Sequence, residues 1–276
     1  HLQRVRWGPD GWPLIGDPPG SPVASGRMPV VVAGAGPGAG NDAGPAPTGA
    51  DPPGRGPAGG DDFTGDRLGP QWFWPANPQP GWWRPGRPSG LRLACLPGPA
   101  GPDLRRLANL LGQRLPIGPV RADTTLRLAA GAGPVRAGLA VVGDGYAWIG
   151  LERTGPDLRL VYRTAAPGQP ELDAVAPVPV PADRPEVALT VTVDAEAMCR
   201  FTASTPGPAQ HLGPAQHLGP AQQVGPAFPA GPGHWVGATL GLFAMAPPEP
   251  DGPPGPASPP VEFAEFDRFT LTPAWK

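Results

Sequence analysis

From Asp61 onward, short apolar runs follow one another along the chain and are separated by glycine, proline and aspartate. Several runs alternate: in residues 187–194 every second residue is Val or Leu, and Ala, Thr and Asp lie between them. A period of two places the apolar residues on one face of an extended strand. Apart from a single helical turn expected at 104–111, no segment has a helical period of useful length. The pattern therefore predicts an all-β sandwich of two antiparallel sheets. The expected strands are 71–74, 91–95, 110–116, 121–129, 136–142, 146–153, 158–163, 187–194, 198–203, 235–244 and 261–272.

The segments outside these strands have a different texture. In residues 1–25, Asp10-Gly11 lies between Trp7 and Trp12, which predicts a β-hairpin. A lone hairpin is marginally stable in water, so this segment needs a partner. Residues 26–60 are rich in Gly, Pro and Ala and are expected to form a linker. Residues 61–276 form the predicted sandwich, with low-complexity inserts at 205–233 and 246–260. The first insert repeats Gly-Pro-Ala-Gln every six residues and is expected to be an extended loop.

Composition narrows the range of partners. The net charge is -2, with acidic and basic residues interspersed, so we expect neither nucleic acid nor an anionic membrane as a partner. No apolar run reaches the roughly 18 residues of a membrane span. Cys95 and Cys199 fit no metal or redox spacing and are expected to be two small buried hydrophobes, with a disulfide as the less favoured alternative. The sequence starts at His1 in what reads as structured sequence. We therefore expect the natural N-terminus to lie upstream, and the compartment, bacterial cytoplasm or secreted, stays open.

No residue of this chain is expected to be catalytic. A glycosidase needs two carboxyl groups on either side of a sugar. The best local cluster is Glu262, Glu265 and Asp267, but only the last two share a strand face. A solvated terminal strand is the better interpretation. His211 and His217 lie in the repeat, where an organised zinc site is not expected.

Aromatic and planar polar residues are candidates for a carbohydrate site. Flat rings stack on the C–H faces of sugars, and Arg or Gln side chains pair with neighbouring hydroxyl groups. The candidates are Trp72, Trp74, Gln113, Arg114 and Trp148. For the tryptophans, burial in the core is the favoured alternative, whereas for Gln113 and Arg114 the two interpretations are equal.

A cofactor is not expected, with one exception. Asp62, at the start of the first strand, and Asp267, on the last, could approach each other if the terminal strands pair. Carboxylate oxygens suit Ca²⁺, so these two residues are candidate ligands of a structural calcium ion.

Short motifs in a fixed order resemble one known family, and any single one of them is weak. They are Asp61-Asp62-Phe63, Leu68-Gly69, Gln71-Trp72-Phe73-Trp74, Asn77-Pro78, Arg87-Pro88, Gly90-Leu91-Arg92-Leu93, Asn109 to Arg114, Gly118-Pro119, Arg136 to Ala140, Tyr146 to Gly150, Trp235 to Phe243 and Phe263 to Phe269. Together they resemble the concanavalin A-like (jelly-roll) C-terminal domain of glycoside hydrolase family 43, the β-xylosidases and α-L-arabinofuranosidases. Residues 1–25 resemble the last strands of that family's five-bladed propeller. The chain departs from the family at 201–207, where the hexapeptide array replaces a hairpin.

The resemblance implies an accessory role. Family 43 enzymes are inverting, and their two Asp and one Glu lie on the propeller, so none of them maps onto this chain. It implies a sandwich that packs on a propeller catalytic domain, helps to shape its pocket and serves hydrolysis of O-glycosyl bonds in hemicellulose. Xylo- or arabino-oligosaccharides are the expected ligands. An independent carbohydrate-binding module and a purely stabilising domain are the alternatives.

Overall fold

The computed structural model describes residues 5–7, 13–15, 59–86, 90–99, 101, 103–129, 131, 133–181, 183–205, 221–233, 236–248 and 262–274. The chain divides into two compact units, His1–Ala50 and Asp51–Lys276. The described part of the first unit is one antiparallel pair, β1 (Val5–Trp7) and β2 (Pro13–Ile15), with Trp7 opposite Pro13. Two strands therefore flank Asp10-Gly11 as predicted, while the turn itself lies outside the described residues.

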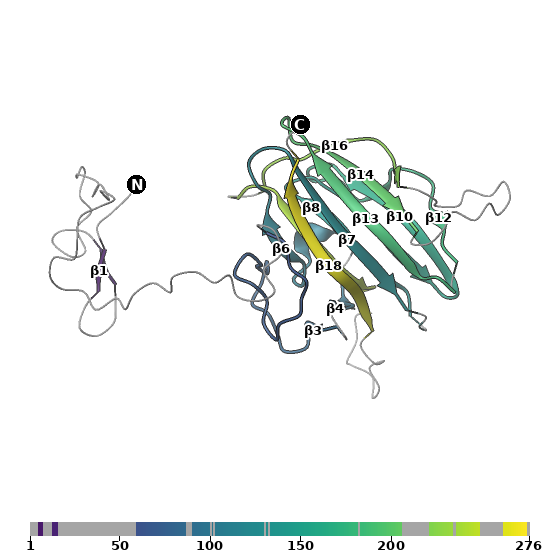
Figure 1. Ribbon diagram of the computed structural model, residues 1–276, viewed down its shortest axis with the longest axis horizontal. Helices are drawn as coiled ribbons and strands as arrows, with labels where there is room; N and C mark the ends of the chain where they lie inside the picture. The colour runs from purple at the N-terminus through teal and green to yellow at the C-terminus, as the bar shows by residue number, and fades with distance from the viewer. Residues whose placement is uncertain are drawn as a thin grey trace. The chain divides into compact units, whose positions relative to one another are not determined.

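The second unit is a β-sandwich, as the alternation predicts (Figure 1). Sheet 1 has the strand order β11-β10-β9-β8-β17-β5, with β12 beside β10 and β6 beside β17. Among its described strand pairs, only β5 and β17 run parallel. The strands of sheet 1 are β5 (Leu96–Pro97), β6 (Leu111–Arg114), β8 (Val135–Val142), β9 (Tyr146–Thr154), β10 (Asp157–Ala165), β11 (Leu172–Asp173), β12 (Val178–Pro179) and β17 (Thr239–Ala246).

Sheet 2 is antiparallel in all of its described pairs and has the order β15-β14-β13-β7-β18-β4-β3, with β16 beside β14. Figure 1 shows its long strands β14, β13, β7 and β18 side by side as one layer. The strands of sheet 2 are β3 (Trp83–Pro85), β4 (Leu91–Ala94), β7 (Val120–Leu128), β13 (Glu186–Val193), β14 (Met198–Ser204), β15 (Gln222–Gln223), β16 (Phe228–Pro229) and β18 (Phe263–Pro273).

The main core lies between the sheets. Every second residue of β13, from Val187 to Val193, is buried in it, together with residues of β8, β9 and β10 on the facing sheet. Burying one such Leu or Val side chain contributes about 1.5–3 kcal/mol. Cys95 and Cys199 are buried in this core as free thiols, which confirms the favoured interpretation.

A second apolar cluster covers the opposite face of sheet 1. It joins Tyr146 and Trp148 of β9 and Phe243 of β17 to Leu104, Leu107 and Leu110. Leu104 belongs to a single 3-10 turn, η1 (Leu104–Arg106), which is the turn expected at 104–111. Asp103 caps this turn by accepting a hydrogen bond from the backbone N–H of Arg105 at 3.0 Å. The segment from Asp103 to Leu110 therefore lies across what we call the outer face of sheet 1.

One predicted strand is wrong. Residues 71–74 make only an isolated bridge between Phe73 and Gly112, and the Trp72 N–H bonds to the Gly69 carbonyl at 3.1 Å, as in a turn. The last long strand before the second insert also begins at Thr239 rather than at residue 235. The described residues contain no helix that is both long and apolar enough to cross a lipid bilayer.

Candidate functional site

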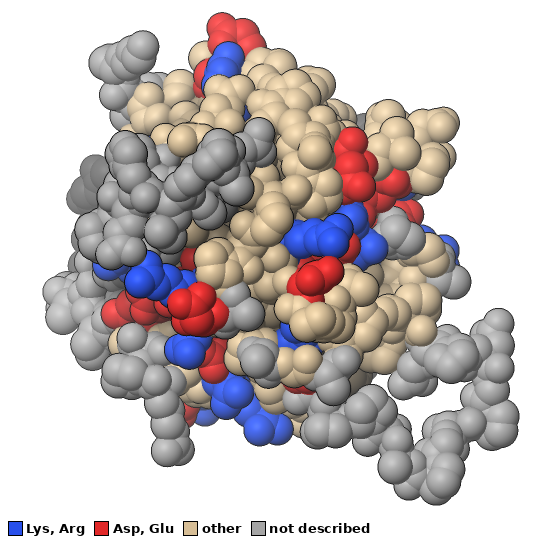
Figure 2. All heavy atoms as spheres, turned by 90° about the vertical axis from the view of Figure 1, so that its right-hand side faces the viewer, with Lys and Arg blue, Asp and Glu red and all other residues tan. Residues whose placement is uncertain are grey.

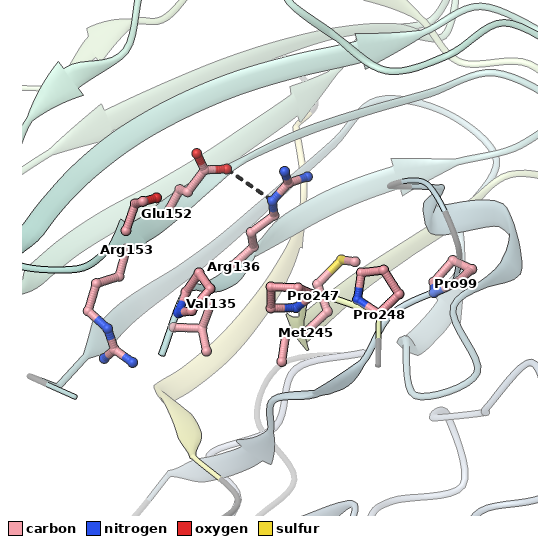
Figure 3. Close-up of a pocket in the computed structure, with 11 residues that line it drawn as sticks. Pro99, Val135, Arg136, Glu152, Arg153, Met245, Pro247 and Pro248 are labelled. Atoms are coloured by element: carbon pink, nitrogen blue, oxygen red, sulfur yellow. Dashed lines mark ion pairs between the residues drawn. The ribbon is translucent and has the colours of Figure 1, made fainter. Parts of the chain in front are cut away.

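Two depressions on the outer face of sheet 1 contain arginine side chains. The smaller has a volume of about 160 Å³ and is lined by Arg136, Glu152, Met245 and several prolines. In Figure 3, Arg136 and Glu152 point toward each other at its side. Arg136 Nε lies 3.0 Å from Glu152 Oε2, and Arg136 Nη1 lies 3.0 Å from Glu171 Oε1. The charges of this depression are thus already paired within the protein.

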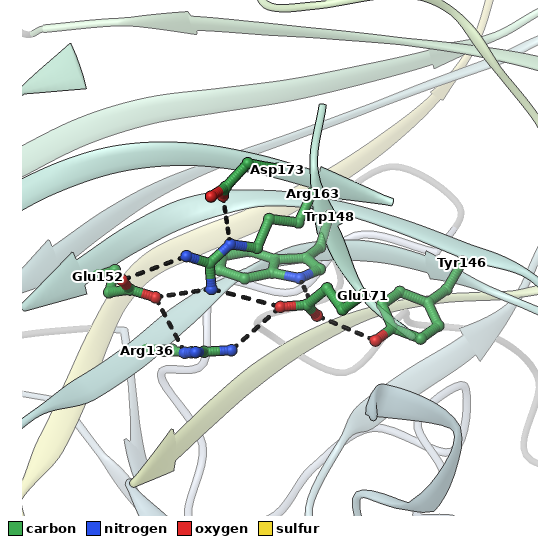
Figure 4. A network of polar contacts seen from close by, with 7 residues as sticks. All are labelled: Arg136, Tyr146, Trp148, Glu152, Arg163, Glu171 and Asp173. Atoms are coloured by element: carbon green, nitrogen blue, oxygen red, sulfur yellow. Dashed lines mark hydrogen bonds and ion pairs between the residues drawn. The ribbon is translucent and has the colours of Figure 1, made fainter. Parts of the chain in front are cut away.

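Glu171 is the centre of that pairing (Figure 4). Its side chain is only 3% exposed, and its Oε2 accepts hydrogen bonds from Tyr146 OH at 3.0 Å and Trp148 Nε1 at 2.8 Å. Arg163 Nη1 lies 2.8 Å from Glu152 Oε2 and 3.3 Å from Glu171 Oε1. Burial, and then the charge of Glu171, raise the pKa of Tyr146 above its ordinary range. This network fastens the segment before β11 onto the sheet.

Several exposed charged side chains also form ion pairs with one another. On the face shown in Figure 2, acidic and basic side chains lie beside one another and are separated by uncharged residues. Arg92 lies 3.3 Å from Glu265, and Arg121 lies 2.6 Å from Asp123. Exposed pairs of this kind contribute little to stability.

The larger depression has a volume of about 530 Å³ and lies at one end of sheet 1. We call it the Arg114 groove. Strand register builds its floor, because Thr239 of β17 is paired with Arg114 of β6 on one side and with Val142 of β8 on the other. Its remaining lining residues come from residues 73–75, 104–110 and 143–144, and from Gly233, Val236 and Gly237.

Two charged side chains of the Arg114 groove, Arg114 and Asp144, make no ion pair with a described residue, whereas Arg105, which also lines it, is paired with Asp103 at 2.7 Å. The Arg114 guanidinium lies 4.3 Å from the centroid of the Phe73 ring and makes no hydrogen bond or ion pair with a described residue. Asp144 is exposed, and its carboxylate makes no hydrogen bond or ion pair with a described residue. Its charge adds to the side-chain hydrogen bond of Asp103 in raising the pKa of the Arg105 guanidinium, and its backbone carbonyl accepts from Arg105 Nη1 at 3.0 Å. Trp74 is half-buried and packs edge-on against Trp82, with ring centroids 5.5 Å apart. Unpaired donors and acceptors beside aromatic rings are what a bound polar ligand would use.

The structure brings together two of the five predicted carbohydrate residues, Trp74 and Arg114, in this groove. The other three are inside the protein. Trp72 is 8% exposed and donates to Asp61 Oδ2 at 2.7 Å, and Gln113 is 4% exposed and donates to the Gly59 carbonyl at 2.7 Å. Trp148 is fully buried in the outer-face cluster. These three side chains cannot reach a sugar at the surface, which corrects the prediction for them.

Two groove residues were missed from the sequence. In the expected strand 71–74, Phe73 would lie on the opposite face from Trp74, whereas the structure has only an isolated bridge there. Asp144 carries no signal beyond its position in the turn between β8 and β9, and that turn comes beside residues 231–233 only in the fold. The hydrogen bond from Asp144 N to the Pro232 carbonyl, at 2.9 Å, makes that contact.

The candidate calcium ligands lie near a common point of the backbone. Gly90 N donates to the Asp62 carbonyl at 3.2 Å, and a Cβ on Gly90 would lie 3.0 Å from the Asp267 carbonyl oxygen. Asp61 pairs with Phe269, so the first segment does meet the last strand as expected. Asp62 Oδ1 accepts from Thr64 Oγ1 at 2.9 Å, and Asp267 is exposed. The described residues hold no group of three or more His, Cys, Asp or Glu that could bind a metal ion. Calcium binding here stays a prediction.

The sequence of residues 60–270 matches the family described as the β-xylosidase C-terminal concanavalin A-like domain of GH43. The chain belongs to this family. The concanavalin A-like sandwich expected from the resemblance is therefore shown, and the chain carries the C-terminal domain of the GH43 type. No curated protein sequence matches the chain.

Solved structures of GH43 proteins share the fold. An engineered GH43 glycoside hydrolase with endo-xylanase and exo-arabinofuranosidase activity is 20% identical, with a TM-score of 0.62 over 98% of this chain and 48% of its own. A xylan β-1,4-xylosidase from Bacillus halodurans is 20% identical, with a TM-score of 0.59 over 98% of this chain and 46% of its own. A GH43 protein from Bacillus licheniformis is also 20% identical, with a TM-score of 0.58 and coverages of 98% and 46%. The chain thus spans about half the length of these GH43 proteins.

Proposed function

We propose that this chain serves as the C-terminal accessory part of a family 43 glycosidase that hydrolyses O-glycosyl bonds in xylose- or arabinose-containing hemicellulose. The observation that carries the proposal is the family match over residues 60–270. The structural relatives are about twice as long as the region they share with this chain, and two of them are named for action on xylan or arabinofuranosides. The partner of the sandwich is then a propeller catalytic domain of the same enzyme.

The chemistry of the described residues supports an accessory rather than a catalytic role. An inverting glycosidase needs two carboxyl groups about 6.5–9.5 Å apart with room for a water molecule between them. Glu152 and Glu171 are bridged by Arg136 and Arg163, so no sugar can enter between them. Asp144 is the one carboxylate among the described residues that line the Arg114 groove.

Two measurements test the proposal. We expect the purified chain to release no 4-nitrophenol from 4-nitrophenyl β-D-xyloside or α-L-arabinofuranoside. Turnover by the isolated chain would overturn the accessory role. The coding sequence upstream of His1 should encode a propeller with three spaced carboxylates in the same reading frame. A start codon directly before His1 would contradict membership of a longer enzyme and leave an independent binding protein.

A further inference from the structure

We propose that the Arg114 groove is a binding site for an uncharged oligosaccharide, of the pentose type that xylan provides. The pentose class rests on the proposed function, whereas the binding of a sugar rests on the groove alone. The five groups that carry the proposal are the side chains of Phe73, Trp74, Arg114 and Asp144 and the exposed backbone of Gly237.

The first argument is that the Arg114 side chain is held in place while its N–H donors bind no described residue. Its guanidinium stacks on Phe73 at 4.3 Å, which fixes the plane of its N–H donors. The guanidinium groups of the two other stacked arginines on the outer face, Arg105 and Arg163, form hydrogen bonds or ion pairs with protein groups. Arg105, over the Tyr146 ring, donates to the carbonyls of Asp144, Ala166 and Gln169.

Arg163, over the Trp148 ring, is bonded to Glu152, Glu171 and Asp173. Arg114 is different because a planar, oriented set of donors faces an open groove. Such a set matches neighbouring hydroxyl oxygens, in the way that the same fork matches two carboxylate oxygens elsewhere.

The second argument is the balance of charge. Asp144 contributes an accepting carboxylate to the same groove as the donating Arg114, and the two form no ion pair. Arg105 also lines the groove, but its charge is paired with Asp103 at 2.7 Å. The two remaining charged groups, Arg114 and Asp144, are of opposite sign, so together they favour neither an anion nor a cation. A ligand that carries both donors and acceptors but no charge satisfies both groups, and a sugar hydroxyl is donor and acceptor at once.

The third argument is shape. The groove is open to solvent, and Gly233 and Gly237 are among the residues that line it. A Cβ on Gly237 would meet no atom within 4 Å, so this edge is unobstructed. A volume of about 530 Å³ lies within the usual 300–1,000 Å³ of small-ligand sites. Trp74 and the apolar Val236 supply apolar surface for the C–H groups of a sugar ring.

Protein docking is the rival occupant. Val236 is 43% exposed and Ile117 fully exposed, and both lie near this end of sheet 1, where Leu115 N bonds to the Ala238 carbonyl. Two apolar side chains are few for a protein interface, whereas the unpaired Arg114 and Asp144 would be costly to bury without partners. The groove chemistry therefore favours a sugar.

The test is titration calorimetry of the full chain with xylotetraose, with cellotetraose as the hexose arm. We expect saturable binding of xylotetraose that weakens at least tenfold in both Arg114→Ala and Asp144→Asn. Arg114→Lys, which keeps the charge and loses the planar fork, should weaken binding nearly as much. Arg84→Ala is the matched control, because Arg84 stacks on Phe263 at 4.9 Å outside the groove. Its affinity should equal that of the wild type.

Each outcome is decisive. Equal or tighter binding of cellotetraose would overturn the pentose class. Absence of binding, or binding that both groove variants leave intact, would overturn the site. Loss of assembly with a family 43 propeller in Arg114→Ala, without any sugar binding, would assign the groove to protein docking and also overturn the site. Binding that survives when no propeller is encoded upstream would uphold the groove and contradict only the proposed function. The melting temperature of each variant, expected to be unchanged, separates loss of binding from loss of fold.

Discussion

Two arginine–aromatic stacks on the same face of sheet 1 show how differently one type of contact is used. Arg163 lies 5.7 Å from the Trp148 ring centroid, is 12% exposed and is surrounded by three carboxylates. Arg114 lies 4.3 Å from the Phe73 ring centroid, is exposed and has no carboxylate partner among the described residues. An arginine–aromatic stack by itself therefore does not indicate whether the arginine has a structural or a binding role.

The two stacks differ in the partners of the guanidinium N–H groups: protein carboxylates for Arg163 and solvent for Arg114. In the Arg163 stack every charged group is paired inside the protein, and removing the 3% exposed Glu171 takes one partner from each of two arginines and the acceptor from two buried aromatic side chains. In the Arg114 stack the donors face solvent, and removing them costs the fold little. An unpaired polar group on a rigid base is the feature that separates a binding surface from a structural one.

The largest expected effect is at the centre of the Arg163 stack. Glu171→Ala removes the carboxylate that pairs with Arg136 and Arg163 and accepts from Tyr146 and Trp148. Breaking a buried pair in this way costs about 3–5 kcal/mol. Chemical denaturation of the wild type and the variant measures this loss directly. Arg114→Ala is the counterpart and should change the free energy of unfolding by less than about 1 kcal/mol. Equal losses in the two variants would break the comparison.

A buried side chain that the sequence offered as a sugar contact gives the next effect. Gln113→Ala removes the hydrogen bond to the Gly59 carbonyl and should cost about 1–3 kcal/mol of stability. Xylotetraose affinity of the folded variant should stay unchanged, because Gln113 lies on the inner side of β6. Thermal melting measures the expected loss of stability, and titration calorimetry on the same sample measures the xylotetraose affinity. A stable variant with weakened binding would place Gln113 in the groove after all.

Alkaline titration measures the ionisation of the tyrosine hydroxyl groups, including that of Tyr146, which binds Glu171. The chain has two tyrosines, and burial raises the pKa of both, with Tyr162 at about 12. Because the unfolded chain releases these protons near the ordinary value of about 10, stability is complete below that pH and is lost above it. Each tyrosine should contribute a loss of about 1.4 kcal/mol per pH unit in this window.

Phenolate absorbance should consequently stay low near pH 10 in the folded protein and rise on unfolding. Glu171→Gln removes the neighbouring charge, and one of the two tyrosines should then ionise at lower pH. A wild-type phenolate step near pH 10 without unfolding would show that Tyr146 and Tyr162 are not shielded.

The smallest effect is expected at Asp62 and Asp267, two acidic residues that no described arginine joins by ion pairs. Asp62 and Asp267 offer two side chains, whereas Ca²⁺ takes six to eight oxygen ligands. If they bind calcium, a chelator should lower the melting temperature by about 2–4 °C, which corresponds to roughly 1 kcal/mol for a domain of this size. Asp267→Asn should abolish the difference. Identical melting curves with and without chelator would remove calcium from this molecule.

Most of the long strands could be predicted because their alternation is a local property. The apolar face of residues 187–193 follows from the chain alone, and it is the face that β13 buries. Two-residue strands such as β11 and β15 have no measurable period and are held by their long neighbours β10 and β14. Residues 71–74 have aromatic residues typical of a strand, but the Trp72 N–H bonds to the Gly69 carbonyl as in a turn and the Trp72 side chain is held by Asp61.

The candidate site was only partly predictable for a non-local reason. Alternation places Tyr146 and Trp148 on one face of β9, but it does not reveal that the segment around Leu104 and Leu107 covers that face. Likewise, Arg114 comes near Val142 only through the register of β17, and near Val236 and Gly237 only where the groove forms. Residue type alone could nominate Arg114 and Trp74, and only the topology could join Asp144 to them.

The position of Thr239 between Arg114 and Val142 has a consequence for the thermodynamics of recognition. A guanidinium on a loop would lose conformational entropy when a ligand ordered it, and that loss would weaken the complex. Arg114 projects from a strand paired along its length with β17 and rests on Phe73, which is itself bridged to Gly112. Much of the ordering is therefore complete when the protein folds, long before a ligand arrives. Weak contacts with few hydroxyl groups can then suffice for binding, with a favourable enthalpy that little entropy opposes.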